Sequence, residues 1–223
     1  MKLLLSTSLV LLLASTPFVR AADMYERIHD AIHILDKRQG SDNPIPTEVL
    51  QNAKGVAICT IVKGGIGLGG QGGEGIVVIR HYGPTGTVWR APSAFNISGA
   101  SLGLQLGFTS ISYIIVLNTD RAIGQFFNEG KFKWDATATG TAGADTGIQT
   151  QSTRDLERQD VLVYRESGGL YGGATFGGST IEAKSQINDD AYGEHTHVRD
   201  ILEGKVQPPA QAQKLYDLLD GKE

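Results

Sequence analysis

Cysteine is the scarcest residue of this sequence, with a single copy, Cys59, among 223 residues. One cysteine cannot form an intramolecular disulfide, and it excludes every motif that needs paired cysteines. Cys59 stands inside the apolar run 56–61, and no basic side chain lies beside it in sequence to stabilise a thiolate. The sequence therefore predicts a buried core thiol and not a nucleophile.

Positive charge is also in short supply. The chain has 20 Lys and Arg against 24 Asp and Glu, which gives a formal net charge of −4. Binding to nucleic acid without sequence preference requires clustered positive charge, so nucleic acid is not an expected partner. No G-x-S-x-G elbow and no P-loop is present, which removes two common routes to nucleophilic and phosphate chemistry.

Long apolar runs are confined to the N-terminus. Lys2 precedes the apolar stretch 3–13, and small residues at 19–21 suit a cleavage site, so residues 1–21 are predicted to be a secretory signal peptide. Cleavage after Ala21 would remove Lys2 and Arg20 and shift the net charge from −4 to about −6. No second run of eighteen apolar residues follows, so no membrane span is expected.

Export is therefore expected, to the periplasm or the medium, with residues 22–223 forming one soluble domain. The cleavage site has no cysteine, which excludes the acyl anchor of a bacterial lipoprotein.

Four of the five histidines occur in pairs. His29 and His33 are one helical turn apart, and His195 and His197 form an H-x-H. Two such pairs can complete a tetrahedral zinc site, so a metal-dependent hydrolase is one alternative function. The simpler interpretation is that all four are solvated surface histidines. No cofactor is expected otherwise.

Glycine, by contrast, is abundant, with 29 residues and a dense tract at 64–75. Gly65, Gly67 and Gly70 match G-x-G-x-x-G, but a phosphate-binding loop must run into a helix. The run that follows, 76–79, is Ile-Val-Val-Ile, which is typical of a strand. We interpret the tract as a turn between two core strands, where missing side chains allow either close backbone approach or room for a ligand.

The remaining pattern predicts helices at both ends of the chain and strands between them. Helical spacing covers 24–38, 47–54, 196–202 and 208–219, and one internal helix is predicted over 119–128. The predicted strands are 56–62, 75–80, 87–90, 98–108, 111–117, 161–165 and 170–182. This order indicates an α+β fold with a largely antiparallel glycine-rich sheet, or a partly closed barrel, and helices at the N- and C-terminal ends.

Several segments in a specific order resemble the SYLF domain family. They are Ala53-Lys54-Gly55, the glycine tract, Trp89 to Ala94, Gln105-Leu106-Gly107, Ile115 to Asn118, Gly169 to Ala174, Tyr192-Gly193 and Ile201-Leu202. The resemblance runs from the helix after Pro46 to about Leu202. It implies a non-catalytic module that binds membrane lipid, phosphoinositides in animal members, and in yeast also actin filaments.

Two features separate this chain from that family picture. The helix 24–38 matches the family's amphipathic membrane contact, but its acidic and basic residues are balanced, so it gains little from anionic lipid. An exported protein also does not meet the cytoplasmic actin of its own cell. Actin is therefore a partner by family analogy alone.

Basic side chains near the glycine-rich strands are the candidates for contact with an anionic headgroup. Lys131 and Lys133 alternate with Phe132 and Trp134, a mixture that suits a membrane interface. The predicted lipid-binding residues are Lys54, Lys63, Arg80, Arg90, Lys131, Lys133, Trp134 and Lys184. A pocket ringed by Lys63, Arg80 and Lys184 would favour an enclosed ligand.

The leading hypothesis is therefore an exported, non-enzymatic domain that binds lipid or a membrane surface. The alternatives are the histidine-based hydrolase and a scaffold that binds another envelope protein.

Overall fold

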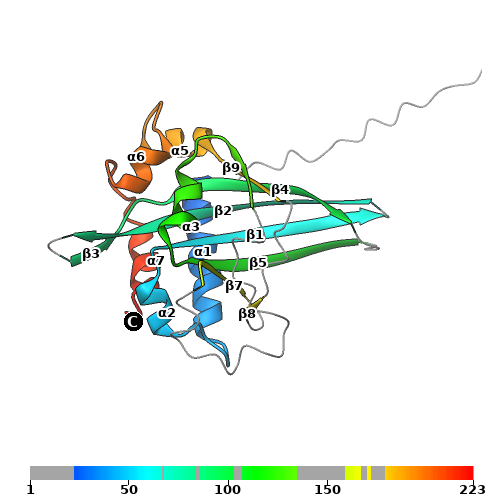
Figure 1. Ribbon diagram of the computed structural model, residues 1–223, viewed down its shortest axis with the longest axis horizontal. Coiled ribbons are helices and arrows are strands. Elements are labelled where there is room, and N and C mark those ends of the chain that lie inside the picture. Colours follow the sequence, from blue (N-terminus) through cyan, green and yellow to red (C-terminus); the bar gives the residue numbers. More distant parts are fainter. Residues whose placement is uncertain are drawn as a thin grey trace, which may run out of the picture.

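The protein has one antiparallel sheet with helices packed against it (Figure 1). The computed structural model describes residues 23–66, 68–83, 86–102, 107–134, 159–166, 170–171 and 179–222. The helices are α1 (Met24–Gln39), α2 (Thr47–Asn52), α3 (Asp120–Gly124), the 3₁₀ turn η1 (Gln125–Phe127), α5 (Ser185–Tyr192), α6 (Val198–Glu203) and α7 (Ala212–Leu219). The predicted signal peptide lies outside the described residues. Within the described ranges, no helix is both long and apolar enough to cross a membrane.

The sheet has nine strands, and eight of them follow the order β6-β9-β4-β2-β1-β5-β7-β8, with β3 paired to β2. The strands are β1 (Gly55–Ile66), β2 (Leu68–Gly83), β3 (Gly86–Trp89), β4 (Ser93–Leu102), β5 (Gly107–Leu117), β6 (Lys131–Lys133), β7 (Val161–Arg165), β8 (Leu170–Tyr171) and β9 (Thr180–Ala183). All of these pairings are antiparallel. The predicted α+β class is confirmed. The sheet of described strands is not closed, so the barrel alternative is wrong.

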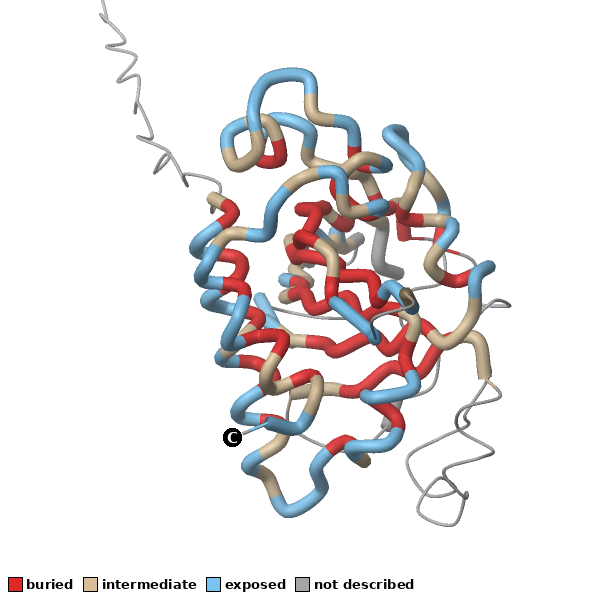
Figure 2. Tube along the Cα trace, turned by 90° about the vertical axis from the view of Figure 1, so that its left-hand side faces the viewer, coloured by how far each residue is buried: buried red, intermediate tan, exposed pale blue. Residues whose placement is uncertain are grey.

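Alternate residues of each core strand enter two separate apolar clusters. Val56 and Ile58 of β1 pack under α1, α2, α5 and α7, on what we call the α1 face. Ala57 and Cys59 pack on the α6 face, against η1, Trp134 and α6. Figure 2 shows the resulting buried centre between layers of exposed chain. Burying one such large apolar side chain contributes roughly 1.5–3 kcal/mol, so two clusters stabilise a sheet covered on both faces.

Helix α1 crosses the strands of the sheet and contacts them from β4 to β7. It begins with a capping box in which Glu26 N donates to Asp23 Oδ1 at 2.9 Å. Near this end, Arg27 Nη1 donates to the Phe95 carbonyl of β4 at 2.7 Å. Towards the other end, the Arg38 guanidinium lies 5.7 Å from the centroid of the Tyr164 ring of β7. Helix α1 therefore spans the sheet, and β1, β2, β4 and β5 project beyond it (Figure 1).

Most of the glycine tract is strand, so the interpretation of the whole tract as a turn is wrong. Strand β2 pairs with β1 from Leu68 to Ile79 and with β4 from Leu68 to Val77. With partners on both sides, the glycine backbone satisfies its hydrogen bonds in the sheet, and the chain reverses only between Ile66 and Leu68.

Three further predictions differ from the structure. The predicted strand 98–108 is divided between the end of β4 and the start of β5, and residues 103–106 lie outside the described part. The predicted strand 170–182 corresponds to β8 and β9, with 172–178 also outside it. Helix α5 was not predicted. Its polar residue Asn188 is held by a residue distant in sequence, because Asn188 Oδ1 accepts a hydrogen bond from Ala94 N at 2.9 Å.

Candidate binding surface

Three of the predicted lipid-binding cations are engaged in ion pairs within the domain. Lys54 Nζ lies 2.7 Å from Asp120 Oδ2, and Lys131 Nζ lies 3.6 Å from Glu182 Oε2. Arg80 Nη2 lies 3.0 Å from Asp220 Oδ1 and is largely buried. These carboxylates offset the positive charge locally, which weakens attraction to an anionic headgroup.

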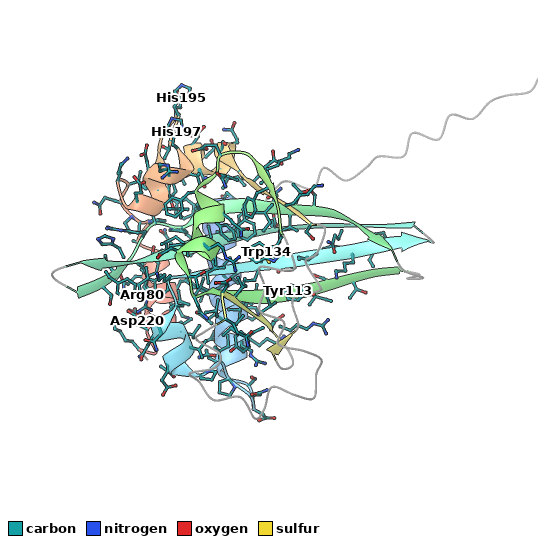
Figure 3. All side chains as sticks on the ribbon, in the orientation of Figure 1. Arg80, Tyr113, Trp134, His195, His197 and Asp220 are labelled. Carbon is teal, nitrogen blue, oxygen red and sulfur yellow. The ribbon has the colours of Figure 1, made fainter. Side chains whose placement is uncertain are left out.

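Arg80 and Arg90 make contacts within the domain that contribute to its structure. The Arg80 guanidinium stacks 4.2 Å from the centroid of the Trp89 ring, and Figure 3 places Arg80 and Asp220 together, away from the projecting strands. The Arg90 carbonyl accepts a hydrogen bond from Tyr216 Oη at 3.0 Å. The Arg90 side chain lies so close to Gly204 that a Cβ there would collide with it.

Trp134 is a core residue. It is 2% exposed and packs 5.9 Å from Phe126, ring centroid to ring centroid. Contact between Trp134 and a bilayer would require the core to open. Lys133 is exposed, whereas Lys63 and Lys184 are half-buried.

No pocket is ringed by Lys63, Arg80 and Lys184. Lys63 pairs with Gln71 of β2, and Arg80 is nine residues further along the same strand. At about 3.3 Å per residue the two positions are roughly 30 Å apart. One ligand-sized cavity cannot be lined by both.

The histidine-based metal site is wrong. His29 and His33 lie on the exposed side of α1, while His195 and His197 lie between α5 and α6 (Figure 3). His197 Nδ1 lies 3.4 Å from Glu129 Oε1. In the part of the chain that the structure describes, no group of three or more His, Cys, Asp or Glu residues could hold a metal ion.

Cys59 is confirmed as a core thiol. Its side chain is buried, and burial raises the pKa of the thiol to about 12. A thiol with such a pKa is protonated at neutral pH and is a poor nucleophile.

The glycines of β2 fall into two alternating classes. A Cβ on Gly73 would lie 2.5 Å from the Thr60 carbonyl oxygen, and one on Gly75 would collide with the Ile58 carbonyl. A Cβ on Gly70 or Gly72 would meet nothing within 4 Å. Both outcomes that the sequence left open therefore occur, close backbone approach at one set of positions and open space at the other.

The open positions belong to an uncovered part of the α1 face. Val62 pairs with Gly72 and Ser110, while Gly64 pairs with Gly70 and Phe108. We call this surface the open face; it consists of Val62, Gly64, Gly70, Gly72, Ser98, Phe108 and Ser110. Val62 is 45% exposed and Phe108 is 88% exposed. A Cβ on Gly64 would collide with the Phe108 ring, so the absence of a side chain there leaves room for the ring.

Charge is scarce at this projecting end. Residues 61–73 contain one charged side chain, Lys63, and residues 97–112 contain none, although charged residues make up 20% of the chain. This charge-free run, which contains Phe108, is the signal by which the sequence could have identified the surface. Phe108 was missed because alternation of apolar residues over 98–108 suggested a core strand.

Two hollows beside α1 do not suit an enclosed lipid. One of about 130 Å³ lies where α1 meets the open face, beside Asp30, Ile34 and Thr60. That volume is well below the roughly 300–1,000 Å³ typical of small-molecule sites. A larger groove of about 390 Å³ between α1 and α5 is lined by Asp23 and Asp190, which disfavour an anionic headgroup. The open face is therefore the best candidate for a binding surface.

An open antiparallel sheet with helices on both faces and an exposed, charge-poor end defines a binding module. The family model described as "Las17-binding protein actin regulator", Ysc84, matches residues 98–222, which is more than half of the chain. This chain belongs to that family, also known as the SYLF domain family, and the resemblance seen in the sequence is confirmed.

Relatives from animals and yeast cover most of the chain. It is 35% identical over 187 residues to the SH3 domain-containing YSC84-like protein 1 of Bos taurus, covering 83% of this chain and 54% of that protein. It is 31% identical over 186 residues to LAS seventeen-binding protein 3 of Saccharomyces cerevisiae, covering 82% and 40%. The chain thus spans about half the length of these relatives or less. No solved structure is significantly similar to it.

Proposed function

We propose that this protein is a non-catalytic module that binds a membrane surface, and that it acts after export. Support for a binding role comes from the family, whose description and whose yeast member LAS seventeen-binding protein 3 name a binding protein and not an enzyme. The protonated, buried thiol of Cys59 also offers no nucleophile.

One observation carries the membrane proposal: an aromatic side chain, Phe108, is 88% exposed at a projecting end of the sheet that contains almost no charge. Exposed apolar side chains on soluble domains mark surfaces that bind proteins or membranes. A charge-poor end suits the membrane because moving a charge into lipid costs several kcal/mol.

Electrostatic attraction is expected to be modest. Lys133 pairs with Thr180, Thr180 with Ser98, and Ser98 with Gly72. Paired residues point to the same side of a sheet, so Lys133 lies on the same side as the open face. One lysine near an anionic surface contributes about 1 kcal/mol, and the half-buried Lys63 is the other cation at this end. Anionic lipid should therefore strengthen binding by roughly fivefold, and added salt should remove that increment.

Vesicle co-sedimentation tests the proposal. The chain from residue 22 is mixed with phosphatidylcholine vesicles, and with vesicles in which a third of the lipid is phosphatidylserine, at low and high salt. Binding to the anionic vesicles at low salt is expected. Lys133→Glu should weaken it at least fivefold, whereas the matched reversal Lys214→Glu, on the exposed side of α7, should change it less than twofold. No binding to anionic vesicles at low salt overturns the proposal.

Export is proposed from the pattern at residues 1–21, a basic residue, an apolar stretch and a small-residue cleavage site. The full chain, expressed in a bacterium, should appear outside the cytoplasm with Ala22 as its first residue. N-terminal sequencing of the fractionated protein measures this. A full-length product confined to the cytoplasm would contradict it.

Protein binding is a second candidate function, favoured by the hairpin of β2 and β3. This hairpin exposes Tyr82 by 54% and Val88 by 51% (β2–β3 in Figure 1). A partner captured by the wild-type chain and identified by mass spectrometry should be lost from a Tyr82→Ser/Val88→Ser variant. Equal capture by both would argue against the hairpin.

A further inference from the structure

We infer that the projecting end of the sheet enters the membrane end-on, with Phe108 as its apolar anchor. The inference rests on the proposed function and adds the orientation, the depth and the anchoring residue.

The strands reach far enough for such contact. Helix α1 lies against β1 around Ile58 and Thr60, and β1 continues for six residues to Ile66. At about 3.3 Å per residue, the end of the hairpin lies roughly 20 Å beyond the helix. The body of the domain can therefore stay in water while the end of the sheet meets the lipid (Figure 1).

Charge selects the end-on orientation over a face-on one. Laying the open face flat on the bilayer would bring the exposed Asp30 of α1 and the partly exposed Glu74 of β2 towards the headgroups. Anionic lipid would repel the Asp30 carboxylate, whereas Glu74 is paired with Arg27 at 2.9 Å. Standing the sheet on its end presents the described residues 61–66, 68–73, 97–102 and 107–112, whose one charge is Lys63.

The residue types at this end are apolar. The register pairs Ile66 with Leu68 and Leu68 with Leu102. Phe108 of β5 pairs with Gly64, which is two residues before the end of β1. Aliphatic and aromatic residue types together are the composition of segments that bind at the membrane interface.

Backbone pairing limits the depth of insertion. Strands β1 and β2 have partners on both sides along the projecting end. Among the described strands, β4 pairs with β9 no further than Ser98, and β5 pairs with β7 only from Tyr113 onwards. Beyond these pairs, the outer edges of β4 and β5 have no strand partner among the described residues, and unpaired backbone groups are not tolerated in hydrocarbon. Insertion is therefore shallow, at the level of the headgroups.

Two matched serine substitutions test the anchor. Phe108→Ser removes an exposed apolar side chain from the projecting end of β5, and Val88→Ser removes one from the β2–β3 hairpin at the opposite end of the sheet. Phe108→Ser should weaken vesicle binding about tenfold, and Val88→Ser less than twofold. Both side chains are exposed, so the melting temperature of each variant should match that of the parent, which separates lost contact from lost folding.

A fluorescent label tests the orientation directly. In a Cys59→Ala background, Phe108→Cys and Val88→Cys are each labelled with an environment-sensitive dye, and vesicles are added. The dye at position 108 should shift to the blue and the dye at 88 should not.

Vesicle binding by the unsubstituted protein, measured alongside the variants, separates the proposal of membrane binding from the inference of the end-on orientation. If the parent co-sediments but the dye at 108 does not shift, or Phe108→Ser binds normally, the end-on inference is overturned and membrane binding stands. If the parent does not bind anionic vesicles, both are overturned.

Discussion

Arg80 Nη2 lies 3.0 Å from Asp220 Oδ1, and this pair joins strand β2 to the residue that ends helix α7. The two residues are 140 positions apart in sequence. Trp89 Nε1 donates to the same carboxylate oxygen at 3.0 Å. One carboxylate thus attaches the last helix to the hairpin of β2 and β3. Because Arg80 is largely buried, loss of its partner would leave a charge without compensation.

Asp220→Ala should lower the free energy of unfolding by about 3 kcal/mol. Urea denaturation measures the effect. Lys222→Ala is the control, since Lys222 Nζ contacts Asp220 Oδ2 at 3.0 Å but is exposed, and the change should stay within about 0.5 kcal/mol. Equal effects would show that the buried pair is not the stabilising contact.

Adjacent glycines should respond differently to alanine. Gly73→Ala places a methyl group 2.5 Å from the Thr60 carbonyl oxygen and should cost about 2 kcal/mol. Gly72→Ala points into open space and should leave stability unchanged or raise it by about 0.5 kcal/mol. Melting temperatures of the two variants test this, and a similar loss in both would refute the two classes of glycine.

Arg27→Met should destabilise the crossing of α1 over the sheet. The guanidinium donates to the carbonyls of Gly75 and Phe95 at 3.2 and 2.7 Å and to Glu74 Oε2 at 2.9 Å. Losing these bonds should reduce the free energy of unfolding by roughly 2–3 kcal/mol. The exposed Arg199, paired with Glu203 at 3.3 Å, provides the control Arg199→Met, with a change below about 0.5 kcal/mol. Urea titration of both variants measures the two changes, and equal losses would contradict a special role for Arg27.

Tyr164 should make the fold sensitive to alkali. Burial raises the pKa of its phenol from 10.0 to about 12, and nearby Arg38 offsets part of that rise. Because the folded-state pKa is the higher one, this stabilising contribution is complete below pH 10 and disappears as the pH rises towards 12.

Tyr164→Phe should therefore lose less stability than the wild type between pH 9 and pH 11, values chosen to bracket the unfolded-state pKa of about 10. At neutral pH the variant should be as stable or slightly more stable, because the buried Tyr164 hydroxyl has no hydrogen-bond partner among the described residues. Thermal melts across this pH range provide the measurement. A steeper alkaline loss in the variant would contradict the assignment.

Elements with a strong local pattern were predictable. Helix α1 has helical spacing and the Asp23–Glu26 capping box, and α7 follows Pro208 with a clear apolar stripe. Helix α5 was missed because its first turns are polar, and its position depends on Asn188 bonding to Ser93 and Ala94, about 95 residues away. Strand alternation over 98–108 was visible, but alternation alone does not reveal that this segment belongs to two different strands, β4 and β5.

The candidate site was less predictable than the fold. Lysine and arginine could be identified by type, but their availability depends on partners far away in sequence, such as Asp120 for Lys54. Trp134 resembled an interfacial aromatic, and packing against Phe126 made it a core residue. Phe108 resembled a core residue, and its position opposite Gly64 left it exposed.

The sequence by itself determined the buried thiol, the scarcity of positive charge, the terminal helices and the family, because each depends on residue types or on spacing along the chain. Only the tertiary structure decided which glycines are packed, which cations are paired and which face is uncovered. These properties depend on strand register and on contacts between segments far apart in the chain. A shift of one residue in register would exchange Gly72 for Gly73 on the open face.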